Sequence, residues 1–231
     1  MARQRMGVAR GVTAALVLIV VGQQAVAADL AQAVSAPQAG ALVTQAPSPW
    51  QIRLRALGVI TEDSGYVNAV PGSDLSYSDT VTPELDFSYF FTDNIAAELI
   101  LGTTYANIDG KGTIGGLGKI GEVWLLPPTL TLQYHFTNFG AFKPYVGAGV
   151  NYTIFYNQDV GSAGALDVKD TFGAALQVGF DYMVDQHWGV NFDVKKLFLE
   201  PDFDVKVGGA NLTGTADLNP WLIGAGVTYR F

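Results

Sequence analysis

The sequence predicts an all-β protein, an eight-stranded antiparallel transmembrane β-barrel with short turns at one end and long loops at the other. Three observations predict this fold. Apolar and polar side chains alternate in runs from Trp50 to Phe231, and a period of two belongs to β-strands. The connections between runs alternate between short and long, as in outer-membrane barrels. The chain also ends on Phe231, with Tyr229 in phase before it.

Residues 1–28 have the pattern of a cleaved signal peptide. Three arginines precede an apolar stretch from Gly11 to Gly22, and small residues follow, which predicts cleavage after Ala27 or Ala28. The apolar stretch is too short for a membrane-spanning helix. Residues 29–49 are rich in Ala, Gln and Pro without a period, which predicts a flexible periplasmic tail before the barrel domain, residues 50–231.

Eight strands follow, in the order 50–60, 80–91, 94–105, 122–136, 143–156, 169–184, 187–199 and 218–231. Short turns are expected at 92–93, 137–142 and 185–186, and long loops rich in Gly, Asp and Asn at 61–79, 106–121, 157–168 and 200–217. A soluble sandwich is the alternative, but it would not sort its loops by length in this way. An even strand count places both termini on the periplasmic side of the outer membrane.

One face of each strand is apolar and would contact outer-membrane lipids. In the second strand this face carries Val81, Leu85, Phe87, Tyr89 and Phe91. Aromatic residues concentrate at both ends of such runs, as they do in the girdles of transmembrane barrels.

The opposite face is charged near the periplasmic end. An eight-stranded barrel is just wide enough for side chains to fill its lumen, and unpaired charges there are costly. The pattern therefore predicts a plug of paired charges, which disfavours an open aqueous porin. Its residues are Arg53, Arg55, Glu84, Asp86, Glu98, Asp181, Asp193, Lys195 and Arg230.

Nearer the external end the inward positions become apolar. Either these residues pack against one another and against the loops, or they line a pocket for an apolar ligand. The predicted pocket residues are Leu57, Val59, Ile100, Leu125, Phe155, Leu197, Leu199 and Leu222.

Pro127 and Pro128 interrupt the well-patterned fourth strand. Neither has an N–H to donate, so the ladder to a neighbouring strand must weaken there. The prolines either loosen pairing above the membrane or mark a lateral opening through which an apolar ligand leaves the lumen.

The composition disfavours other classes of protein. The chain has 13 basic and 21 acidic residues, which argues against nucleic-acid binding, and no cysteine for a disulfide or a Cys-ligated metal. The two histidines, His135 and His187, have no metal-site spacing, so we expect neither a metal nor a cofactor. The glycine pattern in residues 110–121 precedes a strand and not a helix, which predicts an external loop and not a dinucleotide site. We expect no enzymatic activity.

Three segments are similar to the OmpW family of bacterial outer-membrane proteins. They are "WQIRLRALGV" at 50–59, "GEVWLLPPTLTLQYHF" at 121–136 and "KPYVGAGVNYTIFY" at 143–156, together with the terminal "GVTYRF". The resemblance implies an eight-stranded outer-membrane barrel and uptake of small hydrophobic molecules, as in alkane-uptake relatives. The ending with Tyr229 and Phe231 resembles the recognition signal for the barrel assembly machinery.

The predicted function is therefore that of a channel or carrier for a small hydrophobic ligand. A structural barrel whose loops contact a phage, toxin or host, and a narrow ion-conducting pore, remain as alternatives. The ligand and the oligomeric state are left open by the sequence.

Overall fold

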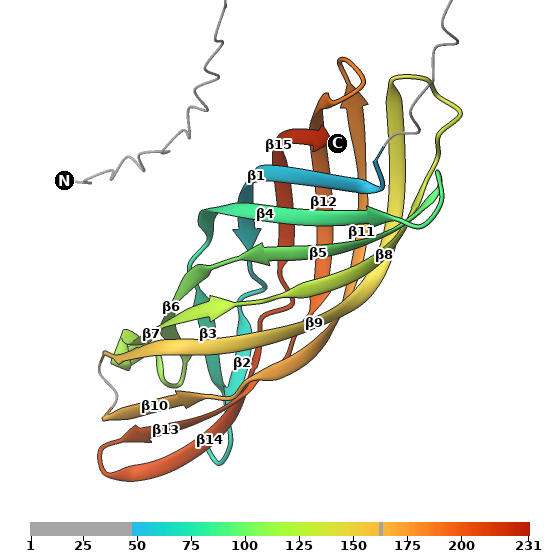
Figure 1. The fold of residues 1–231 in the computed structure, drawn as a ribbon. Helices are drawn as coiled ribbons and strands as arrows, with labels where there is room; N and C mark the ends of the chain where they lie inside the picture. The colour runs from blue at the N-terminus through green and yellow to red at the C-terminus, as the bar shows by residue number, and fades with distance from the viewer. Residues whose placement is uncertain (1–47, 162–163) are drawn as a thin grey trace, which may run out of the picture. The chain divides into compact units, whose positions relative to one another are not determined.

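The structure, a computed structural model, describes residues 48–161 and 164–231 and confirms the predicted eight-stranded barrel (Figure 1). The predicted signal peptide at 1–28 lies outside the described residues, as does the predicted tail up to residue 47. Within the described ranges no helix has the length and hydropathy needed to cross a membrane.

Eight strands form the barrel wall, and two of them are interrupted. The uninterrupted strands are β1 (Trp50–Ile60), β4 (Thr80–Phe90), β9 (Phe142–Val160), β11 (Thr171–Met183), β12 (Trp188–Phe198) and β15 (Trp221–Arg230). The interrupted strands are β5 (Ile95–Gly102) continued by β6 (Thr104–Gly112), and β7 (Lys119–Leu126) continued by β8 (Thr129–His135).

The wall closes because each strand pairs antiparallel with two neighbours. The order runs from β11 through β12, β15, β1, β4, β5 and β8 to β9, and β9 pairs again with β11. Three short turns join β4 to β5, β8 to β9, and β11 to β12, and we call this the short-turn end. The opposite end, which carries the long connections, is the long-loop end.

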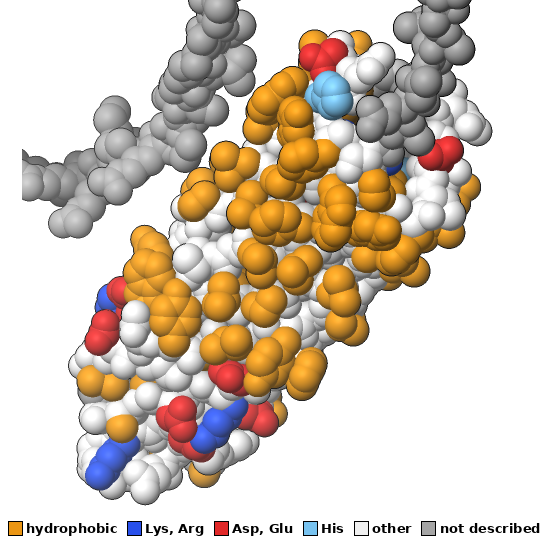
Figure 2. Space-filling model, viewed as in Figure 1, with side chains coloured by type: hydrophobic (Ala, Val, Ile, Leu, Met, Phe, Trp, Pro, Cys, Tyr) orange, Lys and Arg blue, Asp and Glu red, His pale blue; other side chains and the backbone are white. Residues whose placement is uncertain are grey.

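The alternation of outward and inward side chains along each strand gives the barrel an apolar outer face and a lumen lined by the remaining side chains. Side chains at successive positions point to opposite faces of a strand, and the apolar outward ones are highly exposed: Val81 is 80% exposed and Phe172 is 77% exposed. Figure 2 shows hydrophobic side chains over the middle of the visible face, and charged ones gathered toward the end where β10, β13 and β14 lie. This is the surface expected of a barrel in a bilayer.

The long connections differ from the prediction, because most of their residues form strands. Residues 61–79 contain β2 (Ser64–Val67) and β3 (Ser73–Tyr77), and residues 200–217 contain β13 (Asp202–Val207) and β14 (Ala210–Asp217). β3 pairs with β6, and β10 (Ala165–Val168), β13, β14 and β2 form a separate four-stranded sheet. Residues 110–121 are the end of β6, a short 3-10 turn η1 (Gly115–Leu117) and the start of β7. The long connections are rich in Gly, Asp and Asn, which are typical turn residues. This composition obscured the short alternation of apolar and polar residues that marks their strands.

Candidate functional site

A dense ionic cluster fills the lumen toward the short-turn end. Arg53 contacts Glu98 and forms a 2.7 Å ion pair with Asp181. Arg55 lies 2.8 Å from Glu84 and 2.7 Å from Asp86. All six side chains are almost completely buried. Buried charges are tolerated when each has an opposite charge and hydrogen bonds. Every charge here has an opposite charge within 4 Å, while Nε and Nη2 of Arg55 and both carboxylate oxygens of Asp86 make ion pairs without a hydrogen bond.

Lys195 completes the cluster from β12. Its Nζ lies 3.0 Å from Glu84 and 2.8 Å from Asp193. Eight of the nine residues that the sequence assigned to the plug therefore lie in one network, which joins β1, β4, β5, β11 and β12. We call this network the plug.

Arg230 lies outside the plug, which differs from the sequence prediction. Its guanidinium carbon lies 3.8 Å from the centre of the Phe90 ring, and its Nε donates to the carbonyl of Ser48 at 3.3 Å. Among the described residues no carboxylate lies within ion-pair distance of it. Arg230 pairs in register with Gln51 near the start of β1, and its side chain lines a cavity of about 350 Å³ at the short-turn end.

Neutral polar side chains, which the sequence analysis missed, extend the plug. Gln177 donates to both Glu98 (2.9 Å) and Asp193 (2.8 Å), and Tyr145 donates to Asp193 at 2.8 Å. Their positions in β11 and β9 are inward by parity, but a neutral side chain carries no charge that would mark it as part of an ionic cluster. Gly224 leaves room for the Arg55 side chain, because a Cβ at this position would lie 3.2 Å from Cδ of Arg55.

A small apolar cavity of about 60 Å³ lies directly above the plug, toward the long-loop end. We call it the lower cavity. Glu84 of the plug contributes to its lining, together with seven of the eight residues that the sequence assigned to an apolar pocket: Leu57, Val59, Ile100, Leu125, Leu197, Leu199 and Leu222. The eighth, Phe155, lies higher. Leu57, Val59, Leu197 and Leu222 also pack against one another with Ala175, which explains why so little space remains.

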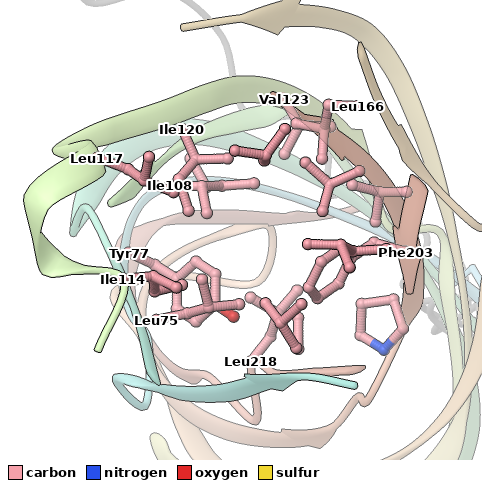
Figure 3. A pocket seen from close by; sticks show the side chains of 18 of the residues that line it. Leu75, Tyr77, Ile108, Ile114, Leu117, Ile120, Val123, Leu166, Phe203 and Leu218 are labelled. Atoms are coloured by element: carbon pink, nitrogen blue, oxygen red, sulfur yellow. The ribbon is translucent and has the colours of Figure 1, made fainter. Parts of the chain in front are cut away.

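The larger cavity, of about 370 Å³, lies within the strands of the long-loop end, and we call it the upper cavity. Figure 3 shows side chains from β3, β6, β7, β10 and β13 pointing into it from all sides, among them Leu75, Ile108, Val123, Leu166 and Phe203. Apart from the hydroxyls of Tyr77 and Thr113, the side chains that line it are apolar. Its size falls in the range of small-molecule sites.

The Tyr77 hydroxyl is already engaged and offers little to a polar ligand. It donates to the carbonyl of Ser64 at 3.1 Å. Burial, together with nearby carboxylates, raises the pKa of this phenol well above its ordinary value, so it stays protonated. A ligand in the upper cavity would therefore find almost purely apolar contacts.

The two cavities are adjacent, since Ala106, Leu125 and Leu218 line both. Together they form an apolar column that starts among the long connections and ends on the plug. Within 48–161 and 164–231 no group of three or more His, Asp or Glu side chains could hold a metal ion.

The wall beside the lower cavity has an unpaired segment. β5 pairs with β8 up to Ile100 opposite Thr129, and β6 pairs with β7 from Thr104 opposite Leu125. Residues 101–103 and 126–128 lie between these pairs in the same register, and no backbone pairing joins them in the described structure. We call this segment the seam. Gly102, Thr103 and Pro127, three of its six residues, line the lower cavity.

The other side of the prolines is closed. The amide of Tyr152 on β9 donates to the carbonyl of Pro128 at 3.0 Å, and Asn151 Nδ2 donates to the carbonyl of Pro127 at 3.1 Å. The prolines therefore weaken one strand pair and not both. The prolines in the sequence predicted the break between β7 and β8. The break opposite, between β5 and β6 at Thr103, is not marked by any residue type that interrupts a strand.

A closed eight-stranded wall, an apolar outer face, a plugged lumen and long connections at one end define an outer-membrane β-barrel of small diameter. Comparison with known proteins agrees. The model of the OmpW family matches residues 49–231, so the chain belongs to the OmpW family.

The relatives include both named and uncharacterised proteins. The chain is 71% identical over 188 residues to "uncharacterized outer-membrane protein y4mB" of Sinorhizobium fredii, covering 80% of each chain. It is 34% identical to outer membrane protein W of Vibrio cholerae, covering 78% of this chain and 87% of that one. It is 30% identical to "dibenzothiophene metabolism operon protein PahQ" of Pseudomonas aeruginosa, covering 80% and 89%.

Among solved structures, the outer membrane protein OprG from Pseudomonas aeruginosa superposes with a TM-score of 0.74 at 27% identity, covering 80% of this chain and 97% of that one. These likenesses support the outer-membrane location and the fold.

Proposed function

We propose that this protein admits small hydrophobic molecules through the outer membrane and releases them sideways into the bilayer. The ligand enters the upper cavity from the external side, moves into the lower cavity and leaves through the seam. In this orientation the long-loop end is external, the short-turn end and both mature termini are periplasmic, and residues 1–28 are removed on export.

One observation carries the proposal: the apolar column ends on a charged plug, while its lower end touches the seam, a wall segment in which the described structure has no backbone pairing. Moving an apolar molecule through the plug would require separating buried ion pairs, which is costly. Passing through the seam exchanges one apolar environment for another. Unpaired backbone in hydrocarbon is unfavourable unless it borders a cavity, and the seam borders the lower cavity.

The name of one relative supports the proposal of an apolar ligand. Dibenzothiophene, which the name of PahQ mentions, is an aromatic molecule of low polarity. The plug disfavours the ion-conducting pore, since its charges are paired with one another and block the lumen.

A disulfide across the seam tests the route. The chain has no cysteine, so Thr103→Cys with Leu126→Cys introduces a single pair. In the register of the flanking pairs these positions lie opposite each other, and the Thr103 hydroxyl already reaches the carbonyl of Leu125, the neighbour of Leu126, at 3.1 Å. We expect two cysteines here to come close enough for a disulfide. Oxidation should abolish uptake of an apolar fluorescent dye by cells, and reduction should restore it.

The matched control is Leu99→Cys with Leu130→Cys. This pair joins the same two strands where they are already paired, and both side chains face outward. Its oxidation should leave uptake unchanged. Undiminished uptake by the oxidised 103–126 variant would contradict lateral release.

A further inference from the structure

Thr103 is the only residue of the seam whose side chain ties the two edges together. Its Oγ1 donates to the carbonyl of Leu125 on β7 at 3.1 Å, and it also shares a hydrogen bond with the hydroxyl of Tyr156. On the other side, the Thr103 carbonyl accepts from Thr82 of β4 at 2.5 Å. Thr103 is therefore anchored to its own side of the seam through its backbone, and to the opposite side through its hydroxyl.

The Tyr156 contact spans a whole strand. Tyr156 lies on β9 and pairs with Trp124 of β7, which in turn pairs with Tyr105 of β6. The hydroxyl of Tyr156 thus reaches from β9 past β7 to the start of β6. Tyr156 has the same strand parity as Tyr152, and its ring lies 6.3 Å from that of Trp124, so the contact is on the outer face of the wall.

We propose that Tyr156 and Thr103 form a latch over the outer face of the seam and set the rate at which a ligand leaves the lower cavity. This inference rests on the proposed lateral route. The prolines lack the N–H groups of a backbone ladder that would hold the seam shut. The hydrogen bond between the two hydroxyls holds the seam shut instead. A hydroxyl pair is suited to a reversible closure because both groups are satisfied when it is closed. When Tyr156 moves away, its hydroxyl in the aromatic girdle is within reach of interfacial water, and the Thr103 bond to Leu125 is then the last side-chain tie across the seam that has to break.

The latch makes Tyr156 a positioning residue, and Tyr156→Phe tests it because only the hydroxyl is lost. One net hydrogen bond changes an equilibrium by about two- to tenfold. Dye uptake per assembled barrel should therefore rise by about two- to tenfold. Amide hydrogen exchange of residues 101–104, measured in lipid bilayers, should accelerate by a similar factor, while exchange of residues 95–100 should not change. Thr103→Val, which removes both hydroxyl contacts, should act in the same direction.

Tyr152→Phe is the matched control. Tyr152 lies on the same strand and face, but its hydroxyl is directed to Asp170 (3.4 Å) and not across the seam. This variant should leave both readouts unchanged.

Unchanged exchange at residues 101–104 in Tyr156→Phe would overturn the latch, whatever happens to uptake. Faster exchange with unchanged or slower uptake would also overturn it as the control on release. The disulfide across residues 103 and 126 tests the route itself, so failure of the latch and failure of the lateral route give different results.

Discussion

Removing Arg55 should destabilise the barrel more than any other single charge removal, because Arg55 contacts the most carboxylates. It is 2% exposed, and its guanidinium lies 2.8 Å from Glu84, 2.7 Å from Asp86 and 3.6 Å from Asp193. Lys195 still pairs with Glu84 and Asp193 in Arg55→Ala, but no other cation lies within 4 Å of Asp86 in the described structure. Leaving one buried charge unpaired costs about 3–5 kcal/mol.

The free energy of unfolding in lipid vesicles, followed by tryptophan fluorescence in urea, measures this loss. Arg230→Ala is the control, because Arg230 makes a cation–π contact outside the plug and should lose about 1 kcal/mol. In the double variant Arg55→Met with Asp86→Leu, both partners are removed. This double variant should recover part of the stability lost in Arg55→Met, since no charge is left without its partner. A loss below about 1 kcal/mol in Arg55→Ala would refute the view that the plug is a network of mutually dependent charges.

Further outcomes follow from other parts of the barrel. Leu125→Asp places a charge where the two cavities meet, and should reduce dye uptake several-fold while the barrel still shows a heat-dependent shift on gels; unchanged uptake would favour simple packing. Gly224→Leu should overfill the plug beside Arg55 and lower the free energy of unfolding by about 1–3 kcal/mol in the same urea titration. Deleting Phe231 should lower the amount of assembled barrel in the membrane fraction without reducing export. Normal assembly of this variant would show that Phe231 is not part of the recognition signal for the barrel assembly machinery. At the turn after β11, two backbone N–H groups, of Trp188 and His187, lower the pKa of Asp185. The stabilisation that the charged Asp185 gives is therefore complete above the ordinary carboxyl pKa range and lost as the pH falls through the lowered pKa. In the urea titration, the free energy of unfolding of Asp185→Ala should be lower than that of the parent at neutral pH and equal to it in acid.

The wall and most of the plug could be predicted from the sequence because both depend on local parity. A side chain in a strand points either to the lipid or to the lumen, and its neighbours two residues away decide which. Arg53, Arg55, Glu98 and Lys195 could therefore be placed inside without knowing their partners. Pro127 and Pro128 could also be identified as a weak point from their chemistry alone, since the missing N–H groups are a property of the residue.

Tertiary structure decided which charges pair, why Arg230 is left out, and where the larger cavity lies. The upper cavity is built by short strands such as β3, β10 and β13, whose residues are far apart in the chain and which pair in two separate sheets. The seam needs the break at Thr103 to lie opposite the prolines, and the hydroxyl of Tyr156 reaches it across an intervening strand. Register and closure bring these groups together, and a periodicity of two within one strand carries no information about which residue of a distant strand lies opposite.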